Sequence, residues 1–281
     1  MVGLNQPGVV EPQQEPAWWR KLSALSKGGM PPALPDRYFD ETYDFPRFMG
    51  KPSVYVIVAT PRSGSSYLGH LLFATKKLGA PLEYLNAAHY RRWSQIVGSE
   101  DPAAVFGEIM TRRTSPSGWF GLKAHWIQLA NLGRFNVPHD ILAFQRIIWI
   151  RRRDLIEQAI SFAIAIQTGA WTSFHKSLGK PIYNYRAIAD CADAIKNMES
   201  AWARFLTQTS TPHLSLYYED VRANEMETVA KILSWFGLPS LEISLSVSLQ
   251  KQSNEINAAW KDRFLYEQST LPAKAAGRSV F

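Results

Sequence analysis

The sequence contains a single cysteine, Cys191, among 281 residues. One cysteine permits neither an internal disulfide nor a cluster of thiolate metal ligands. The longest apolar run, "AISFAIAI", is far shorter than the roughly 20 residues that a membrane helix needs. The first residues also lack the basic segment and apolar core of a signal peptide. Together these absences predict a soluble protein of a reducing compartment, and we expect a cytoplasmic location.

The chain also lacks a strong excess of one charge and any familiar metal-ligand spacing. Lysine and arginine outnumber aspartate and glutamate by 31 to 24, and no block of like charge dominates. A modest basic excess favours anionic ligands but does not indicate a groove for nucleic acid. The six histidines show no paired spacing such as that of an HExxH motif. We therefore expect no nucleic-acid partner and no metal.

Composition divides the chain into three parts. Residues 1–50 are rich in proline, glycine and glutamine, and we expect an extended, partly disordered lead-in that its aromatic residues then pin down. The basic and aromatic "WWRKL" within it suggests, as an alternative, peripheral contact with a membrane surface. Residues 51–268 are predicted to form a single domain, and residues 269–281 a loose C-terminal tail.

Alternating strand and helix patterns predict an α/β fold. Four short, almost continuously apolar runs suit strands that are buried on both faces, as in parallel sheets. They cover residues 54–59, 120–125, 146–151 and 213–218. Helices are predicted over residues 65–78, capped by Gly79, over 154–168, capped by Asp154, and from Asn224 to Phe236. The expected architecture is a central, mostly parallel sheet flanked by helices.

The stretch "PRSGSS" follows directly on the first predicted strand. In a parallel sheet, ligands bind at the carboxyl ends of the strands, where the next helices begin. Gly64 lets the backbone approach a ligand closely, and successive N–H groups of residues 63–66 can surround an anion. Ser65 and Ser66 add hydroxyl donors, and Arg62 adds a planar guanidinium that suits phosphate or sulfate oxygens. The plain alternative is an ordinary strand–helix turn in which a serine caps the helix.

This loop differs from the one that binds nucleoside triphosphates. That motif continues after its last glycine with Lys-Ser/Thr, which hold the phosphates and Mg²⁺. No lysine follows Gly64 here. Phosphoryl transfer from ATP is therefore disfavoured, and a nucleotide-dependent phosphotransferase is kept as an alternative.

Three consecutive arginines form a second cationic feature, at the end of the predicted strand 146–151. Arg153 precedes the expected helix cap, and Ser161 lies two helical turns further on. Asp154 and Ser161 are seven residues apart and share one helix face, so a long arginine at the helix boundary can converge with the serine on one anion. The alternative is a surface cluster of ion pairs. Two anion sites on neighbouring strand ends would suit a ligand with two phosphate groups on different arms.

Six stretches resemble, in order, the Stf0 family of sulfotransferases. They are "PRSGSSYL", "LGAPLEYL", "GLKAHW", "RRRDLIEQAISFAIAIQTGAW", "LYYEDVRANEMETVAKILSWFGLP" and "NEINAAWKDRF". The resemblance spans residues 52–268 and implies a P-loop-like sulfotransferase fold. It implies transfer of a sulfuryl group from 3′-phosphoadenosine 5′-phosphosulfate (PAPS) to a hydroxyl of a carbohydrate or glycoconjugate, with PAP as product and no metal. Members of the family can be dimeric, which allows a homodimer here.

The resemblance also implies roles for individual residues. The loop that holds the 5′-phosphosulfate matches Arg62, Ser63, Gly64, Ser65 and Ser66, and the pair that grips the 3′-phosphate matches Arg153 and Ser161. In the member that sulfates trehalose, the catalytic base is a glutamate of a Gly-Glu-Pro-x-Glu-Phe segment. In the matching stretch, Glu83 takes the position of the base, and Ala80 takes the position of the first glutamate. The alanine departs from the pattern of that member, which bears on the identity of the acceptor.

These residues define the expected chemistry. Arg62 and the loop amides would stabilise the charge that gathers on the leaving oxygen, and Glu83 would take the proton of the attacking hydroxyl. His125, at the rim beside Lys123, is the second candidate for a catalytic base or acid. Residues 84–120 are expected to be the least regular part of the fold and to help form the acceptor site. A non-catalytic binder of anionic glycans is the remaining alternative.

Overall fold

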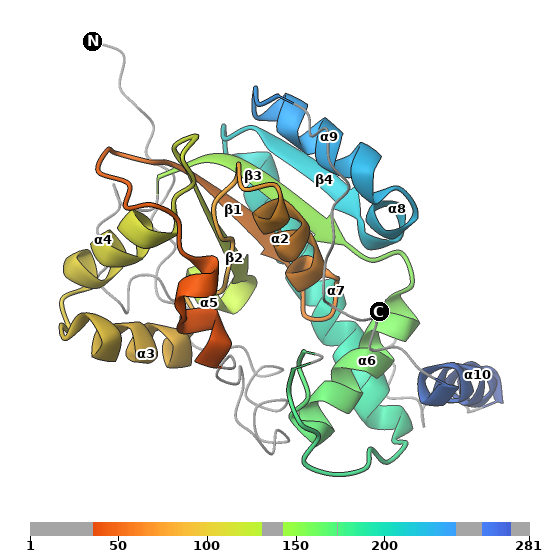
Figure 1. Ribbon diagram of the computed structural model, residues 1–281. Helices are drawn as coiled ribbons and strands as arrows, with labels where there is room; N and C mark the ends of the chain where they lie inside the picture. The colour runs from red at the N-terminus through yellow and green to blue at the C-terminus, as the bar shows by residue number, and fades with distance from the viewer. Residues whose placement is uncertain (1–35, 131–142, 173, 240–254, 271–281) are drawn as a thin grey trace. The chain divides into compact units, whose positions relative to one another are not determined.

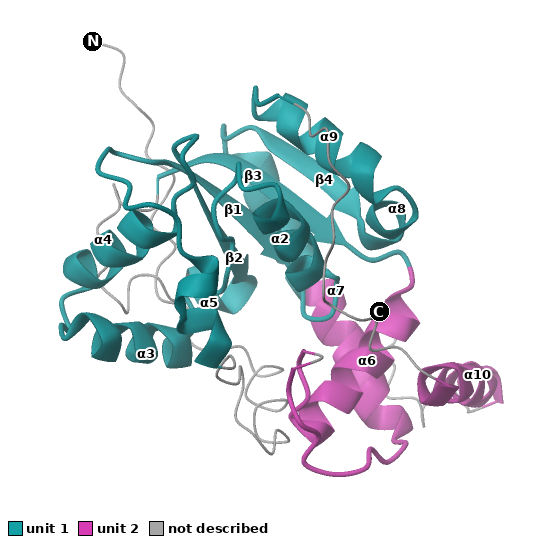
Figure 2. Cartoon of the chain, in the orientation of Figure 1, with its two compact units in different colours: residues 1–15, 33–153, 198–249 teal, residues 16–32, 154–197, 250–281 magenta. Residues whose placement is uncertain are grey.

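The computed structural model describes residues 36–130, 143–172, 174–239 and 255–270 (Figure 1). The chain divides into two compact units (Figure 2). The first, which we call the sheet unit, comprises residues 1–15, 33–153 and 198–249, and the second, the helical unit, comprises residues 16–32, 154–197 and 250–281. A single domain over residues 51–268 stays a prediction.

The sheet unit is built on four parallel strands in the order β2-β1-β3-β4 (Figure 1). The strands are β1 (Ser53–Ala59), β2 (Trp119–His125), β3 (Phe144–Arg151) and β4 (His213–Tyr217). Six of the seven residues of β1 are buried, which accounts for the unbroken apolar run in its sequence. The predicted α/β class, its parallel sheet and its four strands are confirmed.

The strand order creates a divergence at the middle of the sheet. The chain leaves β1 for β2 on one side and leaves β3 for β4 on the other side. Between two such strands the connecting segments turn apart, which opens the place where ligands bind in α/β sheets. The predicted anion loop follows β1, and the three arginines lie at the carboxyl end of β3. Both features therefore lie where the connections diverge.

Helices and short turns surround the strands of the sheet unit. They are η1 (Asp36–Phe39), η2 (Glu41–Tyr43), α2 (Ser65–Ala74), α3 (Ala87–Val97), α4 (Pro102–Arg113), α5 (Trp126–Ala130), α8 (Tyr218–Ala223) and α9 (Glu225–Trp235). The long helix α7 (Tyr185–Gln208) begins in the helical unit and ends in the sheet unit. The helix expected after Asn224 is present, although the side chain of Asn224 makes no capping hydrogen bond.

Helix α2 ends earlier than the predicted range 65–78. The hydroxyl of Thr75 donates to the carbonyl of Leu72 at 2.6 Å, and Lys76 has a left-handed φ of 57°. Gly79 is therefore not its cap. A Cβ at Gly79 would lie 2.8 Å from a carbonyl oxygen of residue 113, so this glycine allows two backbone segments to approach closely.

Residues 84–120 are not the least regular part of the fold, because they contain α3 and α4. Asn86 and Asp101 cap these helices, and their side-chain oxygens accept the N–H groups of residues 88 and 103 at 2.9 and 3.2 Å. The stretch "NAAHYRRW" includes the start of α3, which buries His89 and Trp93. The prediction failed because the capping signals were outweighed by the polar composition of the segment.

The helical unit contains α6 (Leu155–Thr168), the first part of α7 and α10 (Glu255–Thr270). As predicted, Asp154 caps α6, and its carboxylate accepts the N–H of Glu157 at 2.9 Å. The same carboxylate pairs with Lys261 of α10 at 2.5 Å. This ion pair joins the two helices at the beginning of α6.

Among the residues described, no helix combines the length and the apolar character needed to cross a membrane. The "WWRKL" stretch and the expected C-terminal tail, from residue 271 onward, lie outside the described residues. A cytoplasmic location, a homodimer and peripheral membrane contact stay predictions.

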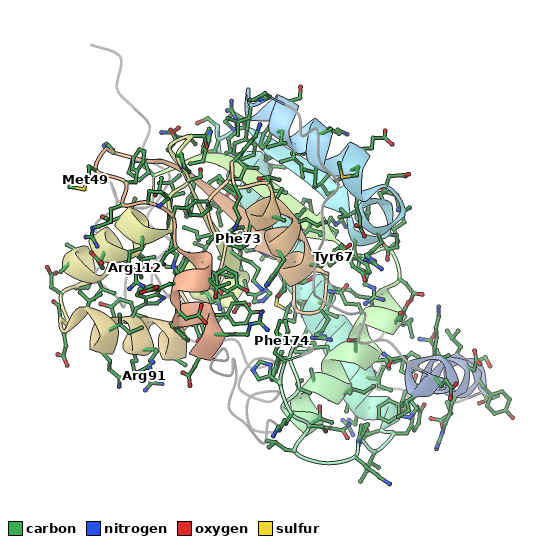
Figure 3. The ribbon with its side chains drawn as sticks, in the orientation of Figure 1. Met49, Tyr67, Phe73, Arg91, Arg112 and Phe174 are labelled. Carbon is green, nitrogen blue, oxygen red and sulfur yellow. The ribbon has the colours of Figure 1, made fainter. Side chains whose placement is uncertain are left out.

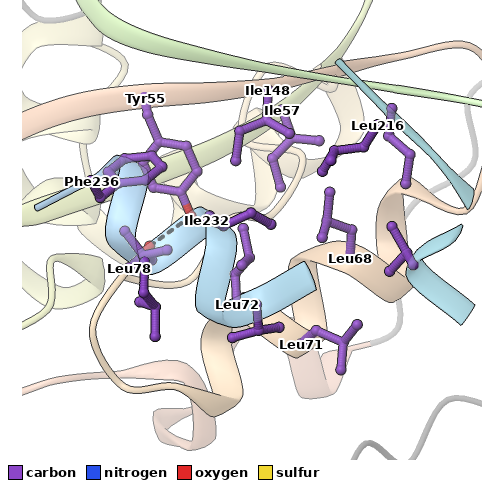
Figure 4. Packing of buried hydrophobic residues seen from close by; sticks show 14 of the residues in the cluster. Tyr55, Ile57, Leu68, Leu71, Leu72, Leu78, Ile148, Leu216, Ile232 and Phe236 are labelled. Atoms are coloured by element: carbon purple, nitrogen blue, oxygen red, sulfur yellow. Dashed lines mark hydrogen bonds between the residues drawn. The ribbon is translucent and has the colours of Figure 1, made fainter. Parts of the chain in front are cut away.

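The apolar core of the sheet unit lies between the sheet and helices α2 and α9 (Figure 4). Ile57 and Ile148 of the strands meet Leu68 and Leu72 of α2, and all four are buried completely. Tyr55 lies in the same cluster, and its hydroxyl donates to the carbonyl of Leu78 at 2.8 Å. This hydrogen bond fixes the chain just after α2, on the way to Glu83.

Replacement of Tyr55 by phenylalanine tests this bond. Tyr55→Phe leaves the buried carbonyl of Leu78 without its donor, so we expect the free energy of unfolding to fall by about 1–3 kcal/mol. Tyr90→Phe is the control, because Tyr90 also donates to a carbonyl, that of Glu100, but at an exposed site. Urea unfolding of both variants measures the difference, and an equal loss of stability would contradict the assignment.

Candidate functional site

The loop after β1, where we predicted an anion site, has an unusual backbone conformation. Arg62 has a φ of 64°, which is uncommon for a residue with a side chain, and Gly64 has a φ of 87°. Helix α2 begins at Ser65, so its first N–H groups have no acceptor within the helix and lie at the end of β1. The hydroxyl of Ser63 is buried and has no hydrogen-bond partner among the described residues. A bound oxyanion would supply the acceptor that this hydroxyl lacks.

An aromatic ring from beyond β4 shapes the loop. A Cβ added to Gly64 would lie 2.1 Å from the ring of Tyr218, so only glycine fits there. Tyr218 also meets the ring of Tyr67 edge to face, with centroids 6.4 Å apart. Tyr67, labelled in Figure 3, accepts a hydrogen bond from Arg222 of α8 at 2.6 Å. The start of α2 is thus tied to the segment that follows β4.

Arg152, which the sequence did not single out among the three arginines, lies at the loop. Its Nη1 donates to the carbonyl of Arg62 at 3.5 Å, and its guanidinium carbon lies 5.3 Å from the Tyr218 ring centroid. Burial and the like charge of Arg152 lower the pKa of Arg62 to about 10, at which Arg62 is still charged near neutral pH. Two guanidinium groups held at one place favour an anionic ligand.

Arg153 and Ser161, the predicted second pair, belong to different units. Arg153 makes two hydrogen bonds, of 2.6 and 2.7 Å, to the carboxylate of Asp220, and its side chain is 51% exposed. Its guanidinium carbon also lies 4.2 Å from the ring centroid of Tyr217. Ser161 lies in α6 of the helical unit. A common anion for Arg153 and Ser161 therefore stays a prediction.

Glu83 lies in a buried cluster of polar side chains. Its Oε1 is 2.7 Å from the Nζ of Lys123, and its Oε2 accepts the side-chain amide of Gln128 at 3.1 Å. The Nε2 of His125 lies 3.7 Å from Oε1. The structure thus brings together Glu83 and His125, two of the three predicted catalytic residues, at the carboxyl end of β2.

The charges around Glu83 decide its ionisation. Burial by itself raises the pKa of this carboxyl, but the positive charge of Lys123 outweighs it and lowers the pKa well below its usual range. Burial lowers the pKa of His125, against the opposing effect of Glu83. Its Nδ1 lies 3.1 Å from the carbonyl oxygen of Ala59, which accepts a hydrogen bond from the tautomer that carries its proton on Nδ1. Glu83 is therefore a carboxylate and His125 a neutral imidazole near neutral pH.

Lys123 joins this cluster to the loop after β1. Its ammonium group donates to the hydroxyl of Ser66 at 2.7 Å and pairs with Glu83 at 2.7 Å, while the residue is only 5% exposed. From the sequence, Lys123 was expected only to lie beside His125 at the rim of the sheet. A lysine inside an otherwise apolar strand was the signal, because a buried lysine needs a charged or polar partner.

A small pocket opens beside these groups. It is lined by Tyr38, Ser66, His70, Pro81, Leu82, Glu83 and Lys123. Ala80 is buried and lies outside this lining, and its carbonyl accepts the hydroxyl of Tyr84 at 2.6 Å. The pocket thus places a carboxylate, an ammonium group and a hydroxyl of the anion loop around one space. Within the described part of the chain, no three His, Cys, Asp or Glu side chains gather as a metal site.

The contact between Gly64 and Tyr218 predicts the effect of one methyl group. Gly64→Ala adds a clash with the ring to the strain of a positive φ, so we expect a loss of stability of about 2–4 kcal/mol and at least about tenfold weaker binding of PAP. Gly98→Ala is the matched control, because Gly98 has a φ of 71° but no atom near its added Cβ. Gly98→Ala should lower the free energy of unfolding by about 1–2 kcal/mol and leave PAP binding unchanged. Thermal unfolding and calorimetric titration measure both effects, and similar PAP affinities for the two variants would contradict the role of the ring.

The chain is similar to known sulfotransferases. A family model described as Stf0 sulphotransferase matches residues 54–267. A trehalose 2-sulfotransferase of Mycobacterium tuberculosis is 25% identical over 257 residues, covering 77% of this chain and 96% of the relative. A second protein of that name, from Mycolicibacterium smegmatis, is 24% identical over 253 residues, covering 76% of this chain and 94% of the relative. The chain belongs to the Stf0 family of sulfotransferases.

Proposed function

We propose that this chain transfers a sulfuryl group from PAPS to a hydroxyl of a carbohydrate or glycoconjugate, with Glu83 as general base. Family membership and the relatives named as trehalose 2-sulfotransferases support sulfuryl transfer to a sugar. One observation carries the finer proposal. The ionised carboxylate of Glu83 lines a pocket and is joined through Lys123 to Ser66 of the anion loop. Transfer between two bound substrates needs this proximity of a base to a donor site.

The loop after β1 would bind the 5′-phosphosulfate. PAPS supplies a sulfuryl group, whose bond to a phosphate oxygen breaks as a bond from sulfur to the acceptor oxygen forms. Arg62 and the N–H groups of residues 63–66 would bind the leaving phosphate and stabilise the negative charge that it gains. The buried hydroxyl of Ser63 can donate to the same oxyanion, and Arg152 adds a second guanidinium nearby.

The 3′-phosphate would bind to Arg153 and Ser161. Arg153 already holds a carboxylate in the two-pronged geometry that also suits phosphate oxygens. In our proposal the 3′-phosphate either replaces Asp220 as the partner of Arg153 or binds to Arg153 together with it. Ser161 would add a hydroxyl donor from the first half of α6.

Lys123 would control the strength of the base. A carboxylate whose charged form is stabilised by a lysine is a weak base, even though burial acts in the opposite direction. Because Lys123 also contacts Ser66, its ammonium group can turn toward the negative charge of a donor bound in the loop. Glu83 would then lose part of that stabilisation and become a stronger base once the donor is in place. Gln128 would hold Glu83 during this exchange, and the neutral His125 would lie ready as a second proton acceptor.

Replacement of Glu83 tests its role as base. Glu83→Gln keeps the shape of the side chain but cannot accept the proton of the acceptor, so we expect turnover to fall by about 10²–10⁴-fold. PAP should still bind with an affinity close to that of the unaltered chain. Transfer of labelled sulfate from PAPS to trehalose and to a panel of other sugars measures turnover, and calorimetry measures the binding of PAP.

The removal of Glu83 also leaves Lys123 without its carboxylate, so a second variant separates catalysis from folding. In the double variant Glu83→Gln, Lys123→Met no uncompensated charge is buried, and its thermal stability should exceed that of the single variant. Recovery of stability without recovery of turnover supports a catalytic role. Full turnover in either variant would contradict the proposal and favour a non-catalytic glycan binder. Product formed from ATP with Mg²⁺, but not from PAPS without metal, would favour a phosphotransferase instead.

Replacement of Arg153 tests how the 3′-phosphate of the donor is bound. Arg153→Ala should raise the KM for PAPS by about 10- to 100-fold, since a charge-assisted hydrogen bond contributes about 1.5–3 kcal/mol. The KM for adenosine 5′-phosphosulfate, which lacks the 3′-phosphate, should rise much less. Arg47→Ala is the control, because Arg47 makes a similar exposed two-pronged pair with Glu108. An equal rise in KM for both donors would show that Arg153 does not bind the 3′-phosphate.

A further inference from the structure

The connection between α6 and α7, which we call the α6–α7 loop (residues 174–184), exposes apolar side chains (Figure 1). Among the described residues, five large apolar side chains are exposed in the helical unit, against three in the larger sheet unit. Two of the five, Leu178 and Ile182, belong to this loop and are 61% and 76% exposed. Exposed apolar side chains that lie together mark a surface of interaction.

Hydrogen bonds hold the loop against the end of α6. The N–H of Leu178 donates to the carbonyl of Thr168 at 2.8 Å, and the N–H of Ile182 donates to the Oε1 of Gln167 at 2.8 Å. Because Gln167 and Thr168 are neighbours, both apolar residues are fixed to the same turn of α6. Their exposure is therefore a property of a loop whose backbone is held in place.

The residue after Ile182 attaches the loop to α10 as well. The hydroxyl of Tyr183 donates to Glu267 at 3.1 Å, and its ring meets that of Trp260 edge to face with centroids 5.6 Å apart. Arg263 pairs with Glu267 at 2.8 Å and lies 3.9 Å from the ring centroid of Tyr183. The carboxylate that adjoins the loop is thus already paired with an arginine.

The charge of the loop itself is entirely positive. No aspartate or glutamate occurs between residues 158 and 189. Lys176 and Lys180 lie two positions before and two positions after Leu178, and both are exposed. Neither ammonium group has a hydrogen-bond or ion-pair partner among the described residues. The loop therefore presents apolar side chains and uncompensated cations on one short, fixed segment.

We propose that the α6–α7 loop binds the surface of a membrane that contains anionic lipids. Leu178 and Ile182 would enter the boundary between headgroups and acyl chains, while the lysines would stay at the level of the headgroup phosphates. Two apolar side chains and two cations make this a weak and reversible contact. The inference is independent of the proposed reaction.

A second copy of this chain fits the loop less well than a membrane does. A two-fold contact through the loop would place Lys176 and Lys180 of one copy against the same lysines of the other, so like charges would meet. An anionic bilayer instead supplies both parts of the complement, a negative surface and an apolar interior.

Sedimentation with vesicles measures the contact. The unaltered chain should sediment with vesicles of equal parts phosphatidylglycerol and phosphatidylcholine, and much less with phosphatidylcholine alone. The double variant Leu178→Ser, Ile182→Ser should bind the anionic vesicles at least about tenfold more weakly, because it loses the apolar surface that would leave water. The double variant Lys176→Gln, Lys180→Gln should bind them about 10- to 30-fold more weakly.

The double variant Met49→Ser, Lys51→Gln is the control. Met49, labelled in Figure 3, is 86% exposed, and Lys51 is exposed two residues further on, but both belong to the sheet unit. This variant should bind vesicles as the unaltered chain does. Melting temperatures of all the variants show whether each one is folded.

Several results would overturn the inference. An unaltered chain that does not sediment with anionic vesicles is one, and equal binding to both kinds of vesicle is another. Folded loop variants that bind as well as the unaltered chain would also contradict it. If the apolar substitutions dissociate an oligomer in sedimentation velocity and leave vesicle binding unchanged, the loop contacts a second copy instead. Sulfation of sugars by a chain that binds no vesicles would overturn this inference and leave the proposed function intact.

Discussion

The ammonium group of Lys123 is the interaction on which the site depends. It is buried between the hydroxyl of Ser66 and the carboxylate of Glu83, at 2.7 Å from each. A buried cation needs such partners, because its desolvation costs several kcal/mol when they are missing. Because Lys123 needs both partners, it links the carboxyl end of β2 to the loop after β1. The group that stabilises the fold locally is thus also the group that sets the charge state of the candidate base.

The sheet order explains why an arginine-rich segment lies beside the serine loop. Adjacent parallel strands β1 and β3 end together, and their connections run to opposite sides. Arg62 and Arg152 are consequently held close in spite of their like charge. The carboxylate of Glu219, whose Oε1 lies 3.8 Å from the Nε of Arg152, offsets part of this repulsion.

Much of this arrangement could be predicted from the sequence, since strand burial leaves continuous apolar runs and anion loops need glycine and serine. Those signals gave the four strands, the loop at residues 62–66 and the position of Asp154. Local propensity could not give the early end of α2, because the turn at Thr75 depends on a side-chain hydrogen bond. The helices within 84–120 were missed although their caps, Asn86 and Asp101, were present. A lysine in an apolar strand indicates a buried charge that needs a partner, but the partners of Lys123, Ser66 and Glu83, follow only from the three-dimensional structure.

The ring of Tyr218 over Gly64 has a consequence for assembly during synthesis. The serine loop emerges early, yet the surface that gives it its shape belongs to the last strand of the sheet and the turn that follows. A nascent chain that stops before β4 would carry every residue of the loop without the ring that packs over Gly64. The packing around Gly64 is therefore completed only after the last strand of the sheet has been made.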